Sequence, residues 1–162
     1  MIEQSTGTER ATAAIVTSGF WLALTAGRLI VASVGGRLSG VHVLFGCLVL
    51  ATVGSVILMV GQQSLAVSAG AYLVIGFAFG PIFPTAVAIA GQITPKLASI
   101  STSLVITGAS FGSMIIPLGQ GAAIEHGGVF AGTGVVLAAH VVMLVLMGAG
   151  LVVFARRKTV DA

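Results

Sequence analysis

The chain is too apolar and too poor in charged residues to be a soluble globular domain. Of its 162 residues, 57% are hydrophobic and 7% are charged, whereas soluble domains carry about 25% charged residues. The net charge of +3 does not indicate a nucleic-acid partner, because Lys and Arg are too few and too dispersed to form a basic face. The composition therefore predicts a membrane protein that has the lipid bilayer as its solvent.

Five apolar stretches are long enough to cross a bilayer as helices, which takes about 20 residues each. Short clusters of polar and turn residues separate them, so successive helices should be antiparallel neighbours. The predicted spans are 11–34, 42–61, 66–91, 97–122 and 129–155. Residues 1–10 are expected to form a short extracytoplasmic segment and residues 156–162 a cytoplasmic tail. The predicted fold class is an all-α membrane protein with about five transmembrane helices.

The positive charges gather on one side of such a bundle. With the N-terminus outside, Arg10 alone lies on the outer face, and the inner face holds Arg28, Arg37, Lys96, Arg156, Arg157 and Lys158. Cytoplasmic loops of membrane proteins are rich in Lys and Arg. The sequence therefore predicts an outside N-terminus and a cytoplasmic C-terminus, in a plasma membrane or a bacterial inner membrane.

Hydroxyl side chains follow one face of the fourth span. Ser99, Ser103, Thr107 and Ser110 recur at spacings of four, four and three residues, which places them on the same side of a helix. They either line a path for a solute, or bond to carbonyls of their own helix and allow another helix to pack closely. The spacing alone leaves both interpretations open.

Small residues recur four apart in three of the spans, and this spacing favours close packing between helices in lipid. The pairs are Ala23 with Gly27, Gly76 with Gly80, and Gly108 with Gly112. They predict a packed bundle and say nothing of its activity.

The third span contains two prolines near its middle. Pro81 and Pro84 have no N–H, so the carbonyls of Phe77 and Gly80 lose their usual helix partners. Such a break should be buried against protein or line a water-filled cavity, because hydrocarbon offers no donor. Broken helices recur at transporter sites, although the same break could be a kink whose carbonyls are satisfied by neighbouring helices.

Three segments of the chain resemble the major facilitator superfamily of transporters. Residues 19–29, which lead into a Gly-Arg connection, look like its eighth helix and the cytoplasmic loop that follows. Residues 76–85 and 107–117 resemble helices ten and eleven of the fucose-permease-like and sodium-dependent-glucose-transporter-like branch. The resemblance runs from about residue 11 to residue 157 and implies helices eight to twelve of a twelve-helix carrier, its C-terminal half.

Within that resemblance, the cytoplasmic loop motif corresponds to Gly27, Arg28, Gly36 and Arg37. Gly36 stands where the superfamily pattern has an Asp. The loss of that carboxylate removes one charge from the network that the motif is proposed to form in gating.

The resemblance implies transport of a small polar solute, with a sugar as the expected class, by symport or facilitated movement, within a larger carrier. The partners implied are the solute, the lipid bilayer, and the missing N-terminal half or another copy. We expect the solute site beside the helix break at Gly80, Pro81 and Pro84, with the substrate-binding residues Trp21, Thr25, Phe79, Phe83, Thr85, Ser103, Thr107 and Ser110. The alternatives are a carrier of another solute, such as a drug or an organic acid, and a truncated membrane fragment that transports nothing.

The sequence does not predict an enzyme, a metal site or a cofactor. The spans contain no Asp or Glu and a single Cys, so converging groups for hydrolysis or metal binding are not expected. His140, in the last span, is expected to be a neutral imidazole bonded between helices in preference to a proton relay. Any carboxylate that couples transport to protons is expected to lie in helices beyond these spans.

Overall fold

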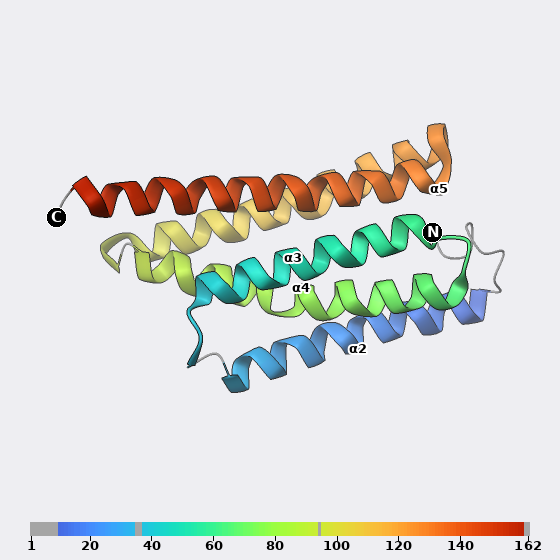
Figure 1. The fold of residues 1–162 in the computed structure, drawn as a ribbon, viewed down its shortest axis with the longest axis horizontal. Coiled ribbons are helices and arrows are strands. Elements are labelled where there is room, and N and C mark those ends of the chain that lie inside the picture. Colours follow the sequence, from blue (N-terminus) through green and yellow to red (C-terminus); the bar gives the residue numbers. More distant parts are fainter. Residues whose placement is uncertain (1–9, 35–36, 94, 161–162) are drawn as a thin grey trace.

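The chain folds as a bundle of long helices that run side by side (Figure 1). The computed structural model describes residues 10–34, 37–93 and 95–160, with the backbone alone at residues 10, 93 and 153–160. Its elements are α2 (Arg10–Val34), α3 (Gly40–Val60), α4 (Leu65–Ile93), the short 3-10 helix η2 (Pro95–Leu97) and α5 (Ala98–Val160). Each of the four α-helices contains a stretch long and apolar enough to cross a membrane. The predicted all-α membrane fold is confirmed.

The helix α5 consists of two antiparallel helices joined at Gly128. The backbone of Gly128 has φ 70° and ψ −172°, a left-handed conformation that glycine adopts without steric cost. The chain turns back on itself at this point (Figure 1), and we call residues 98–127 the first arm and residues 129–160 the second arm. The connection expected at 125–128 is shorter than predicted, because Glu125, His126 and Gly127 remain helical and one residue suffices for the reversal.

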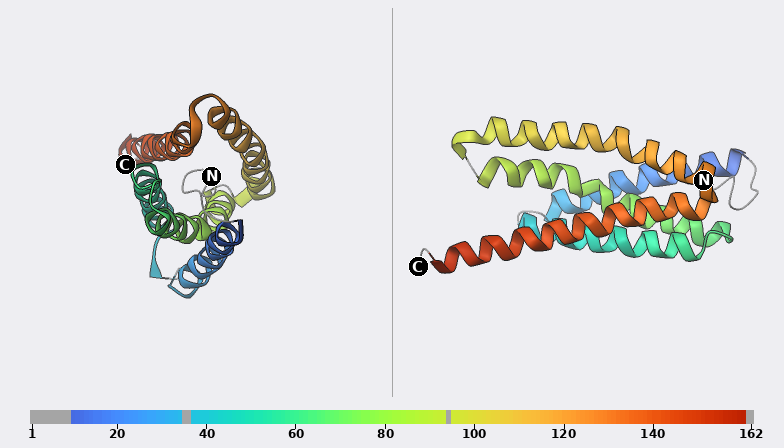
Figure 2. Two further views of the ribbon diagram at one scale, coloured as in Figure 1. Left: turned by 90° about the vertical axis from the view of Figure 1, so that its right-hand side faces the viewer. Right: turned by 90° about the horizontal axis from the view of Figure 1, so that it is seen from above.

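The connections alternate between the two ends of the bundle (Figures 1 and 2). The α2–α3 connection, η2 and the C-terminal end of α5 lie at one end, and the α3–α4 connection and the α5 reversal lie at the other. The connections that carry Arg37 and Lys96 therefore share an end. The predicted cytoplasmic tail is helical as far as Val160, whereas residues 1–9 and 161–162 lie outside the described residues.

The core of the bundle forms around α4, which packs against α2, α3 and α5. Leu58 of α3 and Ala71 and Ile75 of α4 are buried together. Half-buried aromatic side chains surround this cluster, among them Phe20 of α2. The helix α3 also packs against α5, so α3 and α4 together form the centre to which α2 and the second arm attach.

The helices α2 and α4 approach each other so closely that backbone meets backbone. A Cβ added at Gly27 would clash with the carbonyl of Phe77, and one added at Gly80 would clash with the carbonyl of Leu24. Gly76 is held in the same way against α2. Only glycine fits this crossing, as the small-residue spacing predicts for two of its three pairs.

The third small-residue pair makes no such contact with the described residues. A Cβ added at Gly108 or Gly112 would meet nothing within 4 Å. Both residues lie in the first arm, where large apolar side chains such as Leu104 and Met114 are 67% and 65% exposed. The described helices therefore leave most of the surface of the first arm uncovered.

Replacing Gly27 by Ala should destabilise the protein by about 1–3 kcal/mol, because the added methyl overpacks the α2–α4 crossing. The matched change Gly108→Ala has open space around it and should leave stability unchanged or raise it by up to about 1 kcal/mol through helix propensity. Thermal unfolding of the two purified variants in detergent measures both effects. Equal unfolding temperatures would show that the crossing does not limit stability.

The shared end of the basic connections leads us to expect that this end faces the cytoplasm. Single cysteines at Gln63 and Val160, in a Cys47→Ser background, lie at opposite ends of the bundle. An impermeant thiol reagent added to intact cells should label position 63 and not position 160. Labelling of position 160 alone would reverse the orientation.

Candidate functional site

The proline break in α4 is bridged by a side chain from α2. Pro84 has no N–H to donate to the carbonyl of Gly80, and Nε of Arg28 donates to that oxygen at 3.0 Å. The carbonyl of Phe77, which Pro81 deprives of its donor, lies against Gly27. Of the two freed carbonyls, that of Gly80 therefore has a donor from α2, and α4 continues as a helix through both prolines.

Two residues named in the loop motif lie in a helix, as the predicted span 11–34 implies. Gly27 and Arg28 are within α2, which continues to Val34. A charged residue is compatible with this apolar helix because its guanidinium finds a carbonyl partner on α4. Arg37 lies in the α2–α3 connection, and Gly36 lies outside the described residues.

A cavity of about 670 Å³ opens between the end of α2, the start of α3 and the C-terminal half of α4. Its lining includes Pro81, Pro84 and Thr85, which the sequence analysis singled out, and also Ser39 and Gln92, which it did not. The last two are polar residues near helix ends, and Ser39 caps the first turn of α3. Their positions far apart in the sequence give no sign that folding brings them together.

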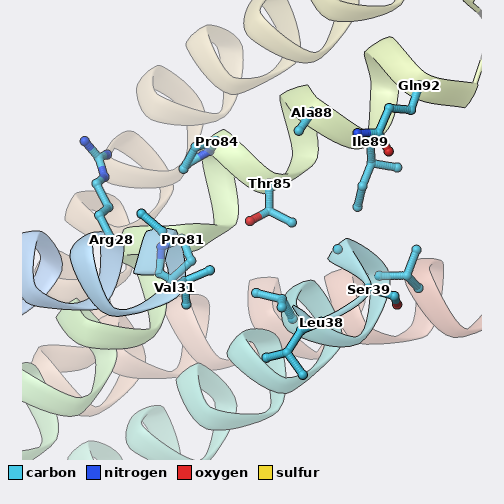
Figure 3. A pocket seen from close by; sticks show the side chains of 14 residues that line it. Arg28, Val31, Leu38, Ser39, Pro81, Pro84, Thr85, Ala88, Ile89 and Gln92 are labelled. Atoms are coloured by element: carbon cyan, nitrogen blue, oxygen red, sulfur yellow. The ribbon is translucent and has the colours of Figure 1, made fainter. Parts of the chain in front are cut away.

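Arg28 lies at the border of this cavity. Figure 3 shows its side chain extending from α2 past Pro81 on the side of Pro84, and its guanidinium pointing away from Leu38 and Ser39. Arg28 is among the residues that line the cavity, while Nε of its charged group is bonded to Gly80 of α4.

The predicted hydroxyl and aromatic residues of α2 and of the first arm lie on open surfaces. Trp21 is 61% exposed, and Thr25, Ser103, Thr107 and Ser110 are exposed as well. The hydroxyl of Thr25 donates to the carbonyl of Trp21 at 3.0 Å, and that of Ser110 donates to its own helix in the same manner. Their oxygens keep lone pairs that can accept a hydrogen bond from a solute.

The three solute-site residues predicted on α4 lie in different surroundings. Phe83 is 43% exposed, whereas Thr85 lines the cavity. Phe79 packs against His140 of the second arm, with 5.2 Å between the ring centroids. The structure therefore separates Phe79 and Thr85 from the open surfaces of α2 and the first arm.

His140 makes the interhelical hydrogen bond that was expected of it. Its ring is 2% exposed, and Nδ1 lies 2.8 Å from Oγ of Ser55 on α3. Nearer one end of the bundle, Nε2 of Gln62 lies 3.4 Å from Oγ1 of Thr133. These two polar contacts join the second arm to α3. Over the described residues, no three His, Cys, Asp or Glu side chains come together as metal ligands.

Long apolar helices, a proline-broken central helix and a cavity beside the break define a multi-pass membrane protein of the transporter type. The chain belongs to the Major Facilitator Superfamily, whose sequence model matches residues 1–161. Members of this superfamily move small-molecule solutes across lipid bilayers. Searches of curated proteins and of solved structures return no match.

Replacing Arg28 by Met should lower stability by about 1–3 kcal/mol, because the carbonyl of Gly80 is left without a donor. The cost should be smaller in a Pro84→Ala background, where the new N–H of residue 84 can donate to that carbonyl. Unfolding of the four proteins of this double-mutant cycle, in one detergent, measures the coupling. An equal cost of Arg28→Met in both backgrounds would show that Arg28 does not replace the missing backbone donor.

Proposed function

We propose that this chain forms one wall of the solute pathway in a larger carrier for a small polar solute such as a sugar. The carrier acts by symport or by facilitated movement. Its N-terminus lies outside and its C-terminus in the cytoplasm of a plasma membrane or a bacterial inner membrane. Membership of the Major Facilitator Superfamily supports solute transport in general, and the identity of the wall rests on the arrangement of the side chains.

The observation that carries the proposal is the set of exposed hydroxyl and indole groups that stand among apolar side chains on α2 and the first arm. Trp21 and Thr25 on α2, and Thr107 on the first arm, are exposed although the helices that hold them are built to lie in a membrane. Polar surface at membrane depth is stable only against protein or water. A further set of helices, either an N-terminal half or another copy of the chain, would enclose these surfaces as a solute pathway.

The chemistry of this wall suits a sugar. Sugars present hydroxyl edges and apolar C–H faces, and binding sites combine apolar or aromatic surface with a few placed polar groups. Trp21 and Thr25 are one helical turn apart, so an indole ring and a hydroxyl group lie on the same side of α2. Phe83 and the hydroxyl groups of the first arm extend the same combination.

Close packing against those further helices is the competing interpretation of the same residues. The spacing of Gly108 and Gly112 favours it for the first arm. The two interpretations differ in what a substitution changes. A packing residue alters the amount of folded carrier, whereas a wall residue alters the affinity for the solute.

Replacing Trp21 or Thr107 by Ala in the complete carrier should weaken solute affinity about two- to tenfold at normal surface abundance. That range corresponds to the loss of roughly 0.5–1.5 kcal/mol from one aromatic contact or hydrogen bond. The neighbouring exposed residues Leu22 and Ile106, each replaced by Ala, serve as matched controls and should leave affinity unchanged. Uptake kinetics and surface labelling of the same cells supply both measurements.

Reduced abundance with unchanged affinity would assign Trp21 and Thr107 to packing. No change in either quantity would remove them from the site. Failure of the complete carrier to move any solute would favour the alternative of a membrane fragment that does not transport.

A further inference from the structure

We propose that Arg28 binds an anionic group of the transported solute, so that the solute is an acid such as a sugar acid and not a neutral sugar. This inference rests on the proposed function, because it names the class of solute that the same wall would accept. It is carried by the position of Arg28 on α2, the orientation of its guanidinium, and the scarcity of carboxylates around it.

Arg28 continues the face of α2 that holds the expected solute wall. Trp21, Thr25 and Arg28 follow one another at spacings of four and three residues, which places them in one row along the helix. All three are exposed. A ligand that touches Thr25 is therefore within one helical turn of the guanidinium.

The guanidinium is held in a fixed orientation near the middle of the length of α4. Its Nε is bonded to the carbonyl of Gly80, which is the sixteenth residue of the 29-residue helix α4. With a rise of 1.5 Å per residue, this carbonyl is roughly 20 Å from the end of α4 near the basic connections. Within the described residues one N–H of five is used, which leaves both terminal nitrogens of the fork for a carboxylate or a phosphate.

A positive charge this far from the ends of α4 is stabilised by a nearby anion. Charged side chains inside a membrane are costly and pair with partners of opposite sign. Among the described residues the only carboxylate belongs to Glu125, which lies near the α5 reversal, at the end of the bundle away from the basic connections. The described part of the chain therefore offers Arg28 a carbonyl and no counter-ion.

A lipid phosphate is a poorer candidate for this anion than the solute. An Arg that reaches for headgroups extends its side chain toward the nearest membrane surface. Side chains of an α-helix lean toward its N-terminus, and Arg28 lies six residues before the C-terminal end of α2. Its bond to the middle of α4 accordingly holds the guanidinium away from the nearer surface.

The test compares solutes of nearly equal size that differ in one carboxylate. Uptake by the complete carrier in phosphatidylcholine proteoliposomes is measured for glucose against glucuronate and for glycerol against glycerate. We expect the acid of at least one pair to be preferred about tenfold or more. Inorganic phosphate should compete with that acid in the unaltered protein, a measurement that needs no variant.

Substitutions then assign the preference to one residue. Arg28→Gln should abolish the preference for the acid, and Arg28→Lys should keep part of it because the charge remains without the fork. Lys96→Gln, which removes an exposed charge from η2, is the matched control and should keep the full preference. Repeating Arg28→Gln with Pro84→Ala, which gives the Gly80 carbonyl a backbone donor, guards against loss of folding.

The remaining outcomes separate this inference from the proposed function. Preferred uptake of the neutral partner, or a preference that survives Arg28→Gln, would overturn the anionic solute while leaving transport intact. Uptake of neither member of any pair would count against the proposed function itself. If phosphatidylglycerol vesicles stabilise the protein in an Arg28-dependent way and the acids are not preferred, the anion is a lipid phosphate and the inference is wrong.

Discussion

The backbone carbonyls of a membrane helix need donors, and hydrocarbon supplies none. In α4 this requirement is acute, because Pro81 and Pro84 each remove a donor from the middle of the helix that holds the bundle together. The close crossing of α2 meets it at one of the two carbonyls, because Arg28 donates to Gly80. The other freed carbonyl, that of Phe77, packs against Gly27. The position of α2 is therefore coupled to the broken part of α4, and Trp21 and Thr25 of α2 are placed by that same contact.

On the opposite side of α4, hydrogen bonds between polar side chains join the helices. Lipid provides little hydrophobic force between two apolar helices, so packing and hydrogen bonds hold them. The pairs Ser55 with His140 and Gln62 with Thr133 join α3 to the second arm. Phe79 packs on the buried imidazole. His140 in the last span thus helps to hold the helices together. Phe79, which was expected beside the solute, contributes to the same packing.

Helix type and helix position were predictable from the sequence because length and hydropathy determine which segments can cross a bilayer. The break at Pro81 and Pro84 was predictable for an equally local reason, since proline lacks a donor wherever it stands. The donor that repairs the break was not, because Arg28 and Gly80 are 52 residues apart in the sequence. The sequence also did not predict which way Phe79 and Thr85 point. The rotation of α4 relative to α2, α3 and α5 decides which of its residues face each of these helices.

The described residues fall into two sets with different surroundings, and Arg28 belongs to both. Residues such as Ser55 and His140 are buried and hydrogen-bonded within the bundle, whereas Trp21 and Thr107 are exposed on its surface. Arg28 donates to α4 with one nitrogen, and the residue as a whole is exposed. Lysine could supply the charge and a single directed bond, but not a bond at Nε together with a planar fork. The bond from Arg28 to Gly80 therefore links the exposed face of α2 to the proline break in α4.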